Sequence, residues 1–179
     1  MNDLSIPIRG ERVSIRRLEE HDLANWYALE TDPDVKRYVN GAVPYSADEF
    51  ISHGHETRRT GAGPLIIELN EDVSFVGKAL LAKNALKTTS QPLGKYEWEI
   101  QVLIARKYWG RGFGEEVVNE LIRAAFTLEE ITSVIAVVHP ENSASRKLMD
   151  KLSFQPDDQK SSPGCWDDNH MVFRLTKPK

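Results

Sequence analysis

EWEIQVLIARKYWGRGFGEEVVNELIRAAFTL, residues 97–128, is the stretch that decides the fold of this chain. Its first part, Glu97–Ile104, predicts a strand, and the glycine-rich segment Gly110–Gly114 leads without a break into an amphipathic helix. Glycine lets the backbone turn tightly and approach a ligand, and the N–H groups and dipole at a helix start favour an anion. The stretch therefore predicts a phosphate-binding loop between a strand and a helix.

The composition predicts one compact domain that spans residues 1–179. Apolar residues make up 40% of the chain, which is enough to bury a core without disulfides or a structural metal. Charged residues make up 28% and the formal net charge is −4, which argues against nucleic acid as the main partner. We therefore expect a globular protein that does not bind nucleic acid.

Cys165 is the only cysteine, so an internal disulfide is impossible and a zinc site built on several thiolates is excluded. We accordingly expect no metal and a reducing compartment. The first ten residues, MNDLSIPIRG, lack the basic-then-apolar pattern of a signal peptide, and no apolar run approaches the ~18 residues that a membrane span requires. The expected location is the cytoplasm, with no membrane partner.

The chain before residue 97 predicts strands and helices in alternation. Ser46 and Glu49 match a capping box at a helix start, and Asn70-Glu71-Asp72 joins two apolar runs as a hairpin turn does. The predicted elements are strand Glu11–Leu18, helices Glu20–Glu30, Asp34–Val39 and Ala47–Arg59, strands Leu65–Leu69 and Val73–Leu81, a turn at Asn40-Gly41 and Pro44, and a polar loop Lys83–Gly94.

The chain after Gly114 continues the alternation. Ile131–Val138 is nearly continuous and β-branched, as a strand covered on both faces is, and Met171–Leu175 predicts a last strand. Ser143–Leu152 predicts a short helix with Ala144, Leu148 and Leu152 on one side. The helix that follows the glycines has one apolar face, formed by Val117, Val118, Leu121, Ile122, Ala125 and Phe126. This order predicts an α/β fold that includes an antiparallel hairpin.

The sequence of the glycine loop by itself leaves three interpretations to consider. A nucleoside-triphosphate loop requires Gly-Lys-Ser or Gly-Lys-Thr, which does not follow these glycines. A dinucleotide fold requires G-x-G-x-x-G and an acidic residue at the end of the next strand, but the spacing is G-x-G-x-G and that strand ends in His139. The third is a tight strand-to-helix connection that binds nothing.

Two further motifs accompany the loop. WGRGFG at residues 109–114, PENSAS at residues 140–145 and KLSF at residues 151–154 together resemble the GNAT superfamily of acyl-CoA-dependent N-acetyltransferases. Trp109, Glu116 and the P-E-N-x-x-S run are most similar to the group that acetylates the N-termini of ribosomal proteins (RimJ/RimL type). The resemblance covers Glu11–Leu175 and is strongest over Glu97–Phe154. It implies a mixed, mostly antiparallel central sheet of about six to seven strands with helices on both faces.

The resemblance implies that acetyl-CoA is the co-substrate and that its pyrophosphate lies against the loop amides, with Arg111 adding a cation. The pantetheine arm would lie along the end of the strand as an added strand does, with the acyl carbonyl directed at an amide near Val102 or Leu103. Asn142 would contact the pantetheine or phosphate side, although asparagine is also a favoured helix N-cap. The implied cofactor contacts are Val102, Leu103, Ile104, Ala105, Trp109, Gly110, Arg111, Gly112, Phe113, Gly114, Glu115, Asn142 and Ser145.

A carboxylate is useful in amine acetylation because the attacking nitrogen must lose a proton. Glu99 aligns with the glutamate that the family carries on this strand, and Glu97 lies on the same strand face, so both are candidate bases. At the position where many members place a proton-donating tyrosine, this chain has Met149. The family also commonly has a small or hydroxyl residue where Glu115 stands, so only the backbone N–H of Glu115 is expected to act.

The function that the resemblance implies is acetyl transfer from acetyl-CoA to a primary amine by direct attack, without a covalent enzyme intermediate. The acceptor would be a protein N-terminus or a small-molecule amine, and the enzyme a monomer or homodimer. Because Met149 replaces the tyrosine, a non-catalytic acyl-CoA sensor of the same fold is the alternative. The loop Pro156–His170, with four aspartates, either overhangs the acceptor site or is solvated.

Overall fold

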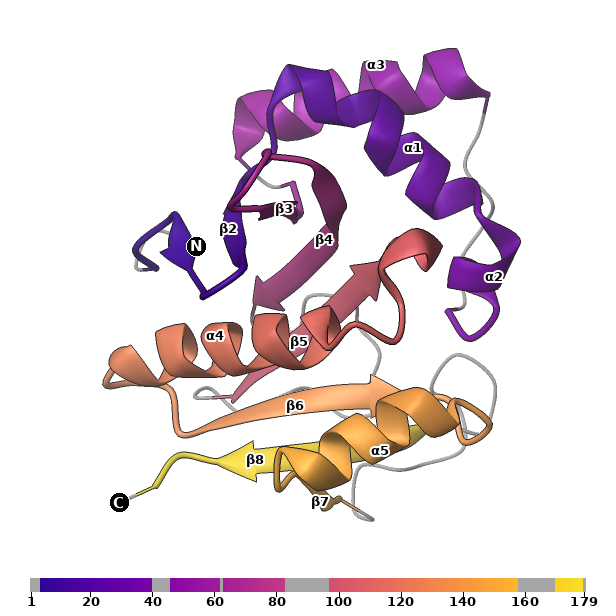
Figure 1. Ribbon diagram of the computed structural model, residues 1–179. Helices are drawn as coiled ribbons and strands as arrows, with labels where there is room; N and C mark the ends of the chain where they lie inside the picture. Colours follow the sequence, from indigo (N-terminus) through magenta and orange to yellow (C-terminus); the bar gives the residue numbers. More distant parts are fainter. Residues whose placement is uncertain (1–3, 40–45, 62, 83–96, 158–169, 179) are drawn as a thin grey trace. The chain divides into compact units, whose positions relative to one another are not determined.

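The computed structural model describes residues 4–39, 46–61, 63–82, 97–157 and 170–178 (Figure 1). The turn at Asn40-Gly41 and Pro44, the polar loop Lys83–Gly94, Cys165 and most of the predicted loop Pro156–His170 lie outside these residues. The chain divides into two compact units, here called the N-terminal unit (Ser5–Ala79 and Val102–Val117) and the C-terminal unit (Met1–Leu4, Leu80–Gln101 and Val118–Lys179).

The N-terminal unit contains an antiparallel run of strands, each paired with the next. The strands are β1 (Ile8–Arg9), β2 (Val13–Arg17), β3 (Leu65–Leu69) and β4 (Phe75–Ala82). The hairpin predicted around residues 70–72 is confirmed, and the pairing register shifts between Ile67 and Glu68, so that Val76 of β4 is an extra residue. Val73, predicted to begin β4, instead has a positive φ of 54° and belongs to the turn.

Helices of the N-terminal unit are η1 (Glu20–Asp22), α1 (Leu23–Thr31), α2 (Pro33–Lys36) and α3 (Ala47–Thr60). The predicted capping box is confirmed, because the Ser46 side chain accepts from the Glu49 N–H while the Glu49 carboxylate accepts from the Ser46 N–H. Helices α1 and α3 lie side by side (Figure 1), with the rings of Trp26 and Phe50 4.8 Å apart in an edge-to-face contact.

Charged side chains fasten α1 to the sheet from both of its ends. At its start Arg16 of β2 bridges Asp22 (2.7 Å) and Glu68 (2.6 Å). At its end the buried Glu30 pairs with Lys78 of β4 and with Lys36 (2.9 Å). Burial alone would raise the pKa of Glu30, but the ammonium groups of Lys78 and Lys36 have the larger effect and lower it below its ordinary value of 4.5. The pKa of Lys78 is lowered, because burial disfavours its charged form.

The C-terminal unit contains a mixed set of strands. They are the first part of β5 (Glu97–Ile104), β6 (Ser133–Val138), β7 (Gln155–Pro156) and β8 (Met171–Thr176). β5 and β6 are parallel, and β8 runs antiparallel to β6 along its whole length (Figure 1). The predicted strand at Ile131 begins two residues later, at Ser133, and its burial on both faces is confirmed.

Two further α-helices complete the fold, α4 (Phe113–Thr127) and α5 (Ser143–Lys151). The predicted apolar face of α4 is confirmed, with Val117 and Leu121 fully buried. In α5 the prediction for Ala144 is wrong: Ala144 is exposed in the first turn, and Met149 is the buried residue. A methyl group covers little core surface, whereas the long methionine side chain reaches it.

These elements make the α/β class and the mixed, mostly antiparallel sheet that the sequence predicts. Eight strands are described, against six or seven predicted, and the difference is the two-residue strands β1 and β7. Among the described strand pairs, only β5–β6 is parallel.

Candidate functional site

The predicted phosphate loop lies between β5 and α4, in the N-terminal unit. After Ala105 the chain forms the short helix η2 (Arg106–Tyr108), and then turns through Gly110 and Gly112, whose φ angles are 71° and 80°. Such left-handed conformations suit glycine and strain other residues, so the two glycines are what let the chain turn here. Helix α4 then starts at Phe113, so the last two residues of the predicted glycine segment Gly110–Gly114 belong to the helix.

The start of α4 collects backbone donors in one place. The first helical hydrogen bond runs from the Glu116 N–H to the Gly112 carbonyl (3.2 Å), so the amides of Phe113, Gly114 and Glu115 precede the helical ladder. The helix dipole adds positive potential at the same end. This geometry can hold an anion through backbone groups alone.

Cationic and aromatic side chains surround these amides. The exposed Arg111 guanidinium lies 5.6 Å from the Tyr108 ring centroid and 5.1 Å from that of Phe113, and the two rings pack edge to face. The ammonium of Lys107 also lies over the Tyr108 ring, 4.9 Å from its centroid. Cation–π contacts hold both charges close to the loop, where they add to the positive potential at the start of α4.

Trp109 ties the loop to the end of β5. Its indole Nε1 donates to the carbonyl of Ile104 at 2.7 Å, while 48% of the residue stays exposed. The tryptophan that the resemblance pointed to thus fixes the distance between the strand end and the glycines. A large exposed aromatic surface remains beside the loop.

Arg12, at the start of β2, is a neighbour of the loop that sequence reasoning missed. The Glu116 carboxylate of α4 accepts from the backbone N–H of Arg12 (2.6 Å), from its Nε (2.7 Å) and from the Val13 N–H (3.2 Å). Arg12 also donates from Nη1 to the Arg111 carbonyl (2.9 Å), and its guanidinium lies 4.6 Å from the Phe113 ring centroid. Glu116 was noted from the sequence only as part of the resemblance, and the structure shows what it binds.

The end of β5 packs tightly against β4. The Ala105 N–H donates to the Val76 carbonyl (2.8 Å), and its own carbonyl accepts from Tyr108, so both backbone groups of Ala105 already have partners. Residue Leu103 is buried in an apolar cluster with Leu29 of α1. Successive residues of a strand direct their backbone groups to opposite edges, so residues 103 and 105 face β4, and Val102 and Ile104 face the other edge.

The two candidate bases lie on β5 in the C-terminal unit, and their surroundings differ. Glu99 is only 2% exposed and ranks among the largest fully buried side chains. Glu97 forms an ion pair with Arg174 of β8, which also binds Ser133 (2.8 Å) and Asp157 (2.7 Å). Burial acts to lower the pKa of Arg174, but Asp157 and Glu97 raise it by more than burial lowers it, so the guanidinium stays charged.

The pairing between β5 and β6 covers only a short segment. In the described part of the chain it runs over three residue pairs, from Glu97↔Ser133 to Glu99↔Ile135, although both strands continue beyond it. The pairing of β5 with β6 therefore ends at Glu99, which is one of the two candidate bases.

The remaining predicted contacts lie around α5, also in the C-terminal unit. The Asn142 side chain accepts from the Ser145 N–H (3.0 Å), so the helix-cap alternative is confirmed. Residue Met149 is buried, and the His139 ring nitrogen accepts from the Glu141 N–H (3.2 Å). The structure thus groups the loop with residues 102–105 in one unit, and Glu97, Glu99, Asn142 and Ser145 in the other.

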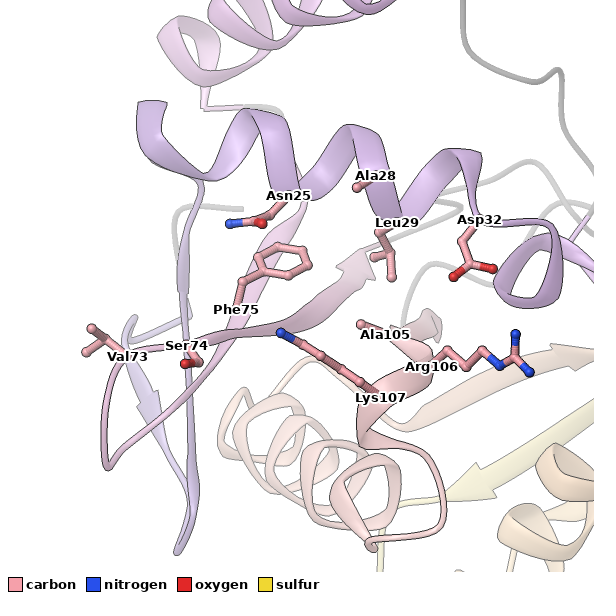
Figure 2. A pocket seen from close by; sticks show the side chains of 10 residues that line it. All are labelled: Asn25, Ala28, Leu29, Asp32, Val73, Ser74, Phe75, Ala105, Arg106 and Lys107. Carbon is pink, nitrogen blue, oxygen red and sulfur yellow. The ribbon is translucent and has the colours of Figure 1, made fainter.

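A cavity of about 920 Å³ opens beside the loop in the N-terminal unit, and Figure 2 shows ten of the side chains that line it. Leu29, Phe75 and Ala105 give it an apolar floor, and Lys107 extends along it toward the start of β4. The lining carboxylate Asp32 caps α2 by accepting from two backbone amides. Its lining comes from three segments far apart in the sequence, which is why local patterns did not reveal it.

No metal centre accompanies the loop in the part of the chain that the structure describes. Across residues 4–39, 46–61, 63–82, 97–157 and 170–178, no three His, Cys, Asp or Glu side chains gather as metal ligands. His53 and His55, two residues apart on α3, are both exposed. None of the described helices is long and apolar enough to cross a membrane.

Comparison with known proteins gives a consistent result. The family model described as an acetyltransferase (GNAT) domain matches residues 12–155. An uncharacterized N-acetyltransferase p20 from Bacillus licheniformis is 29% identical over 155 residues, which cover 81% of this chain and 80% of that protein.

Two solved structures share the fold at low identity. A spermidine N-acetyltransferase from Vibrio cholerae, in complex with CoA and spermine, has a TM-score of 0.73 at 17% identity, covering 92% of this chain and 95% of that one. RimJ from Mycobacterium smegmatis, in complex with CoA-disulfide, has a TM-score of 0.69 at 18% identity. The match covers 92% of this chain and 81% of that one.

Proposed function

The chain belongs to the acetyltransferase (GNAT) domain family, and from this premise we propose that it transfers an acetyl group from acetyl-CoA to a primary amine. The observation that carries the proposal is the loop itself. Gly110 and Gly112, both with positive φ, bring the chain to the start of α4 beside the Arg111 cation. This arrangement suits the pyrophosphate of coenzyme A.

We assign the pyrophosphate to the amides of residues 110–115 and the pantetheine arm to the edge of β5 that faces away from β4. Val102 and Ile104 direct their backbone groups to that edge, where the Ile104 carbonyl already accepts from Trp109. The groups of Val102 and the N–H of Ile104 therefore serve the arm better than those of Ala105, which bind Val76 and Tyr108. The amide of Val102 is then the donor for the acyl oxygen. Asn142 and Ser145, in the C-terminal unit, stay proposed cofactor contacts.

The reaction we propose is a direct attack of the neutral amine nitrogen on the thioester carbonyl. A C–N bond forms, the C–S bond breaks, the sulfur leaves as a thiolate, and the proton lost by nitrogen passes to the Glu99 carboxylate directly or through water. Glu99 suits this role because its side chain is buried and because β5 leaves β6 at that residue. Glu97 is already bound to Arg174, which supports a structural role for it.

No tyrosine stands at the position of Met149, and a thioether cannot donate a proton. A cysteine thiol has a pKa near ~8.5, and coenzyme A is likewise an alkyl thiol, so its thiolate can leave without an acid. We therefore assign departure of the unprotonated thiolate, with later protonation by solvent.

For the acceptor we propose a protein N-terminus or a small-molecule amine of low pKa. An α-amino group has a pKa near ~7.7–8.0, whereas a lysine side chain lies near ~10.4, so the first is more often neutral at pH 7. One structural neighbour is named a spermidine N-acetyltransferase, which supports a small-molecule amine as acceptor in general but not one of low pKa.

We further propose that residues 1–179 act as one acetyltransferase domain in the cytoplasm, as a monomer or homodimer. The second candidate function is an acyl-CoA sensor that binds the cofactor without turnover. The buried Met149 favours it, because it leaves this position without a proton donor for the departing thiolate.

Calorimetry with acetyl-CoA, followed by a transfer assay on a panel of amines, tests these proposals. We expect saturable binding, transfer to an α-amine, and a loss of about 100-fold or more in kcat for Glu99→Gln with unchanged acetyl-CoA affinity. Glu97→Gln is the matched control on the same strand, with kcat within about tenfold of the parent. Binding without transfer to any amine supports the sensor, and no binding refutes both.

A further inference from the structure

Arg12 holds one peptide group of the phosphate loop in a fixed direction. Its Nη1 donates to the carbonyl oxygen of Arg111 at 2.9 Å, across 99 residues of sequence. The peptide that carries this carbonyl also carries the N–H of Gly112. Because a trans peptide is planar, its carbonyl and N–H point in opposite directions. A carbonyl held toward Arg12 therefore turns the Gly112 N–H away from Arg12.

This peptide needs an external restraint because its neighbours provide little. Gly110 and Gly112 both occupy left-handed conformations, and glycine adopts several backbone conformations at similar free energy. A loop with glycine on both sides of Arg111 can rotate that peptide, and rotation would present a carbonyl where the site requires a donor. A partial negative charge there repels phosphate.

Glu116 makes the restraint rigid. Its carboxylate binds the Nε of Arg12 at 2.7 Å and also accepts from the backbone amides of Arg12, just before β2, and of Val13, the first residue of β2. The guanidinium is therefore held between the start of this strand and the first turn of α4. A fork with several parallel donors suits such bridging, which a single ammonium cannot reproduce.

The charges of Arg12 and Arg111 have different partners. The guanidinium carbons of Arg12 and Arg111 lie 4.6 Å and 5.1 Å from the Phe113 ring centroid, so two cations share one ring. Glu116 neutralises Arg12, while in the described part of the chain Arg111 has cation–π contacts and no ion pair. Arg12 thus acts through geometry, and Arg111 keeps its charge for the ligand.

We infer that Arg12 is a positioning residue for coenzyme A: through the Arg111 carbonyl it orients the Gly112 N–H toward the pyrophosphate, and Glu116 holds it in place. The inference rests on the proposed function, because it assumes that the loop binds that pyrophosphate. It predicts a loss confined to ligands that carry a pyrophosphate.

The experiment compares Arg12→Gln and Arg12→Lys with Arg17→Gln, which removes the same charge from the exposed far end of β2. Affinity is measured by calorimetry for acetyl-CoA, and kcat and KM for acetyl-CoA and for S-acetylpantetheine, which lacks the pyrophosphate. We expect both Arg12 variants to raise Kd and KM for acetyl-CoA about tenfold, the size of one hydrogen bond to a charged group, with kcat within about twofold. S-acetylpantetheine kinetics and the Arg17 variant should match the parent.

Each other outcome has a separate meaning. Equal losses with both thioesters indicate a general structural role and overturn the inference. Full acetyl-CoA affinity in Arg12→Lys shows that charge alone matters, and also overturns it, as does an equal loss in Arg17→Gln. A parent protein that does not bind acetyl-CoA refutes the proposed function, and the inference falls with it for that separate reason.

Discussion

Gly77 on β4 has almost no space for a side chain, and Gly77→Ala is the sharpest test of how β5 is held. A Cβ built at Gly77 overlaps the Leu103 carbonyl oxygen and lies 3.0 Å from both the Leu103 carbonyl carbon and the Ile104 Cα. Carbon atoms pack without repulsion at about 3.5–4.0 Å, so the two carbon contacts alone require about 0.5–1 Å of movement, and the overlap with the oxygen requires more. The obstacle is backbone and cannot rotate away.

The cost follows from that movement. Overpacking of a core by one carbon costs about 1–3 kcal/mol, and an obstacle made of backbone belongs at the upper end. If β5 moves away, the hydrogen bond from the Ala105 N–H to Val76 (2.8 Å) lengthens as well. We expect about 3 kcal/mol, and at about 2–4 °C per kcal/mol for a chain of this size Tm should fall by about 6–12 °C.

The assay pairs thermal unfolding with acetyl-CoA kinetics. Gly61→Ala is the control, because Gly61 has a φ of 68° but no atom within 4 Å of its would-be Cβ, so it tests backbone strain without crowding. That variant should lose about 1–2 kcal/mol and keep the parental KM. For Gly77→Ala we expect a higher KM, since Val102 and Ile104 shift with the strand.

Two results would refute this reasoning about Gly77. One is a fall in Tm of less than about 2 °C, which would mean that β4 and β5 separate easily. The other is a large fall in Tm with an unchanged KM, which would mean that the end of β5 does not contact the cofactor. The second result would remove residues 102–105 from the proposed site and leave the glycine loop in it.

Three further predictions concern the buried ion pair and the loop. Lys78→Met should destabilise the protein by about 3 kcal/mol in urea unfolding, because it leaves the buried Glu30 carboxylate with Lys36 alone, and adding Glu30→Gln should recover most of that loss. The pKa of Glu30 is lowered on folding, so the stabilisation that its carboxylate provides is present above pH 4.5 and is lost as pH falls below this value. In a plot of Tm against pH, Glu30→Gln should therefore fall less steeply below pH 4.5 than the parent. An equally steep fall would contradict this prediction. Trp109→Phe removes the 2.7 Å hydrogen bond to Ile104 and should raise KM for acetyl-CoA about threefold and abolish most of the fluorescence change on binding.

Local features of the fold were predictable from the sequence because their causes are local. The capping box needs only Ser46 and Glu49, three residues apart, and the strand Glu97–Ile104 ends where the predicted strand ends. Gly110 and Gly112 predicted a tight turn, and the structure gives both of them the positive φ angles that glycine permits. In each case the side chains that determine the conformation are neighbours in the chain.

Other features depend on residues that only the folded chain brings together. The extra residue Val76 in β4 changes which side chains face α1, and alternation alone does not reveal such a bulge. Arg174 binds Glu97 from 77 residues away, which distinguishes two glutamates that look equivalent in sequence. The role of Arg12 was likewise invisible, because an arginine at a strand start is usually only solvated.

The bond between Arg12 and Glu116 spans 104 residues, and this separation determines when the loop can form. During synthesis β2 is made early, and its partner on α4 emerges about a hundred residues later. Closing so long a chain loop is slow and entropically unfavourable until other contacts have formed. An excised peptide of residues 97–128 would contain every glycine and still lack the restraint on the Arg111 carbonyl, so we expect it to bind phosphate poorly. The loop is local in sequence, but we expect its shape to be acquired late in folding.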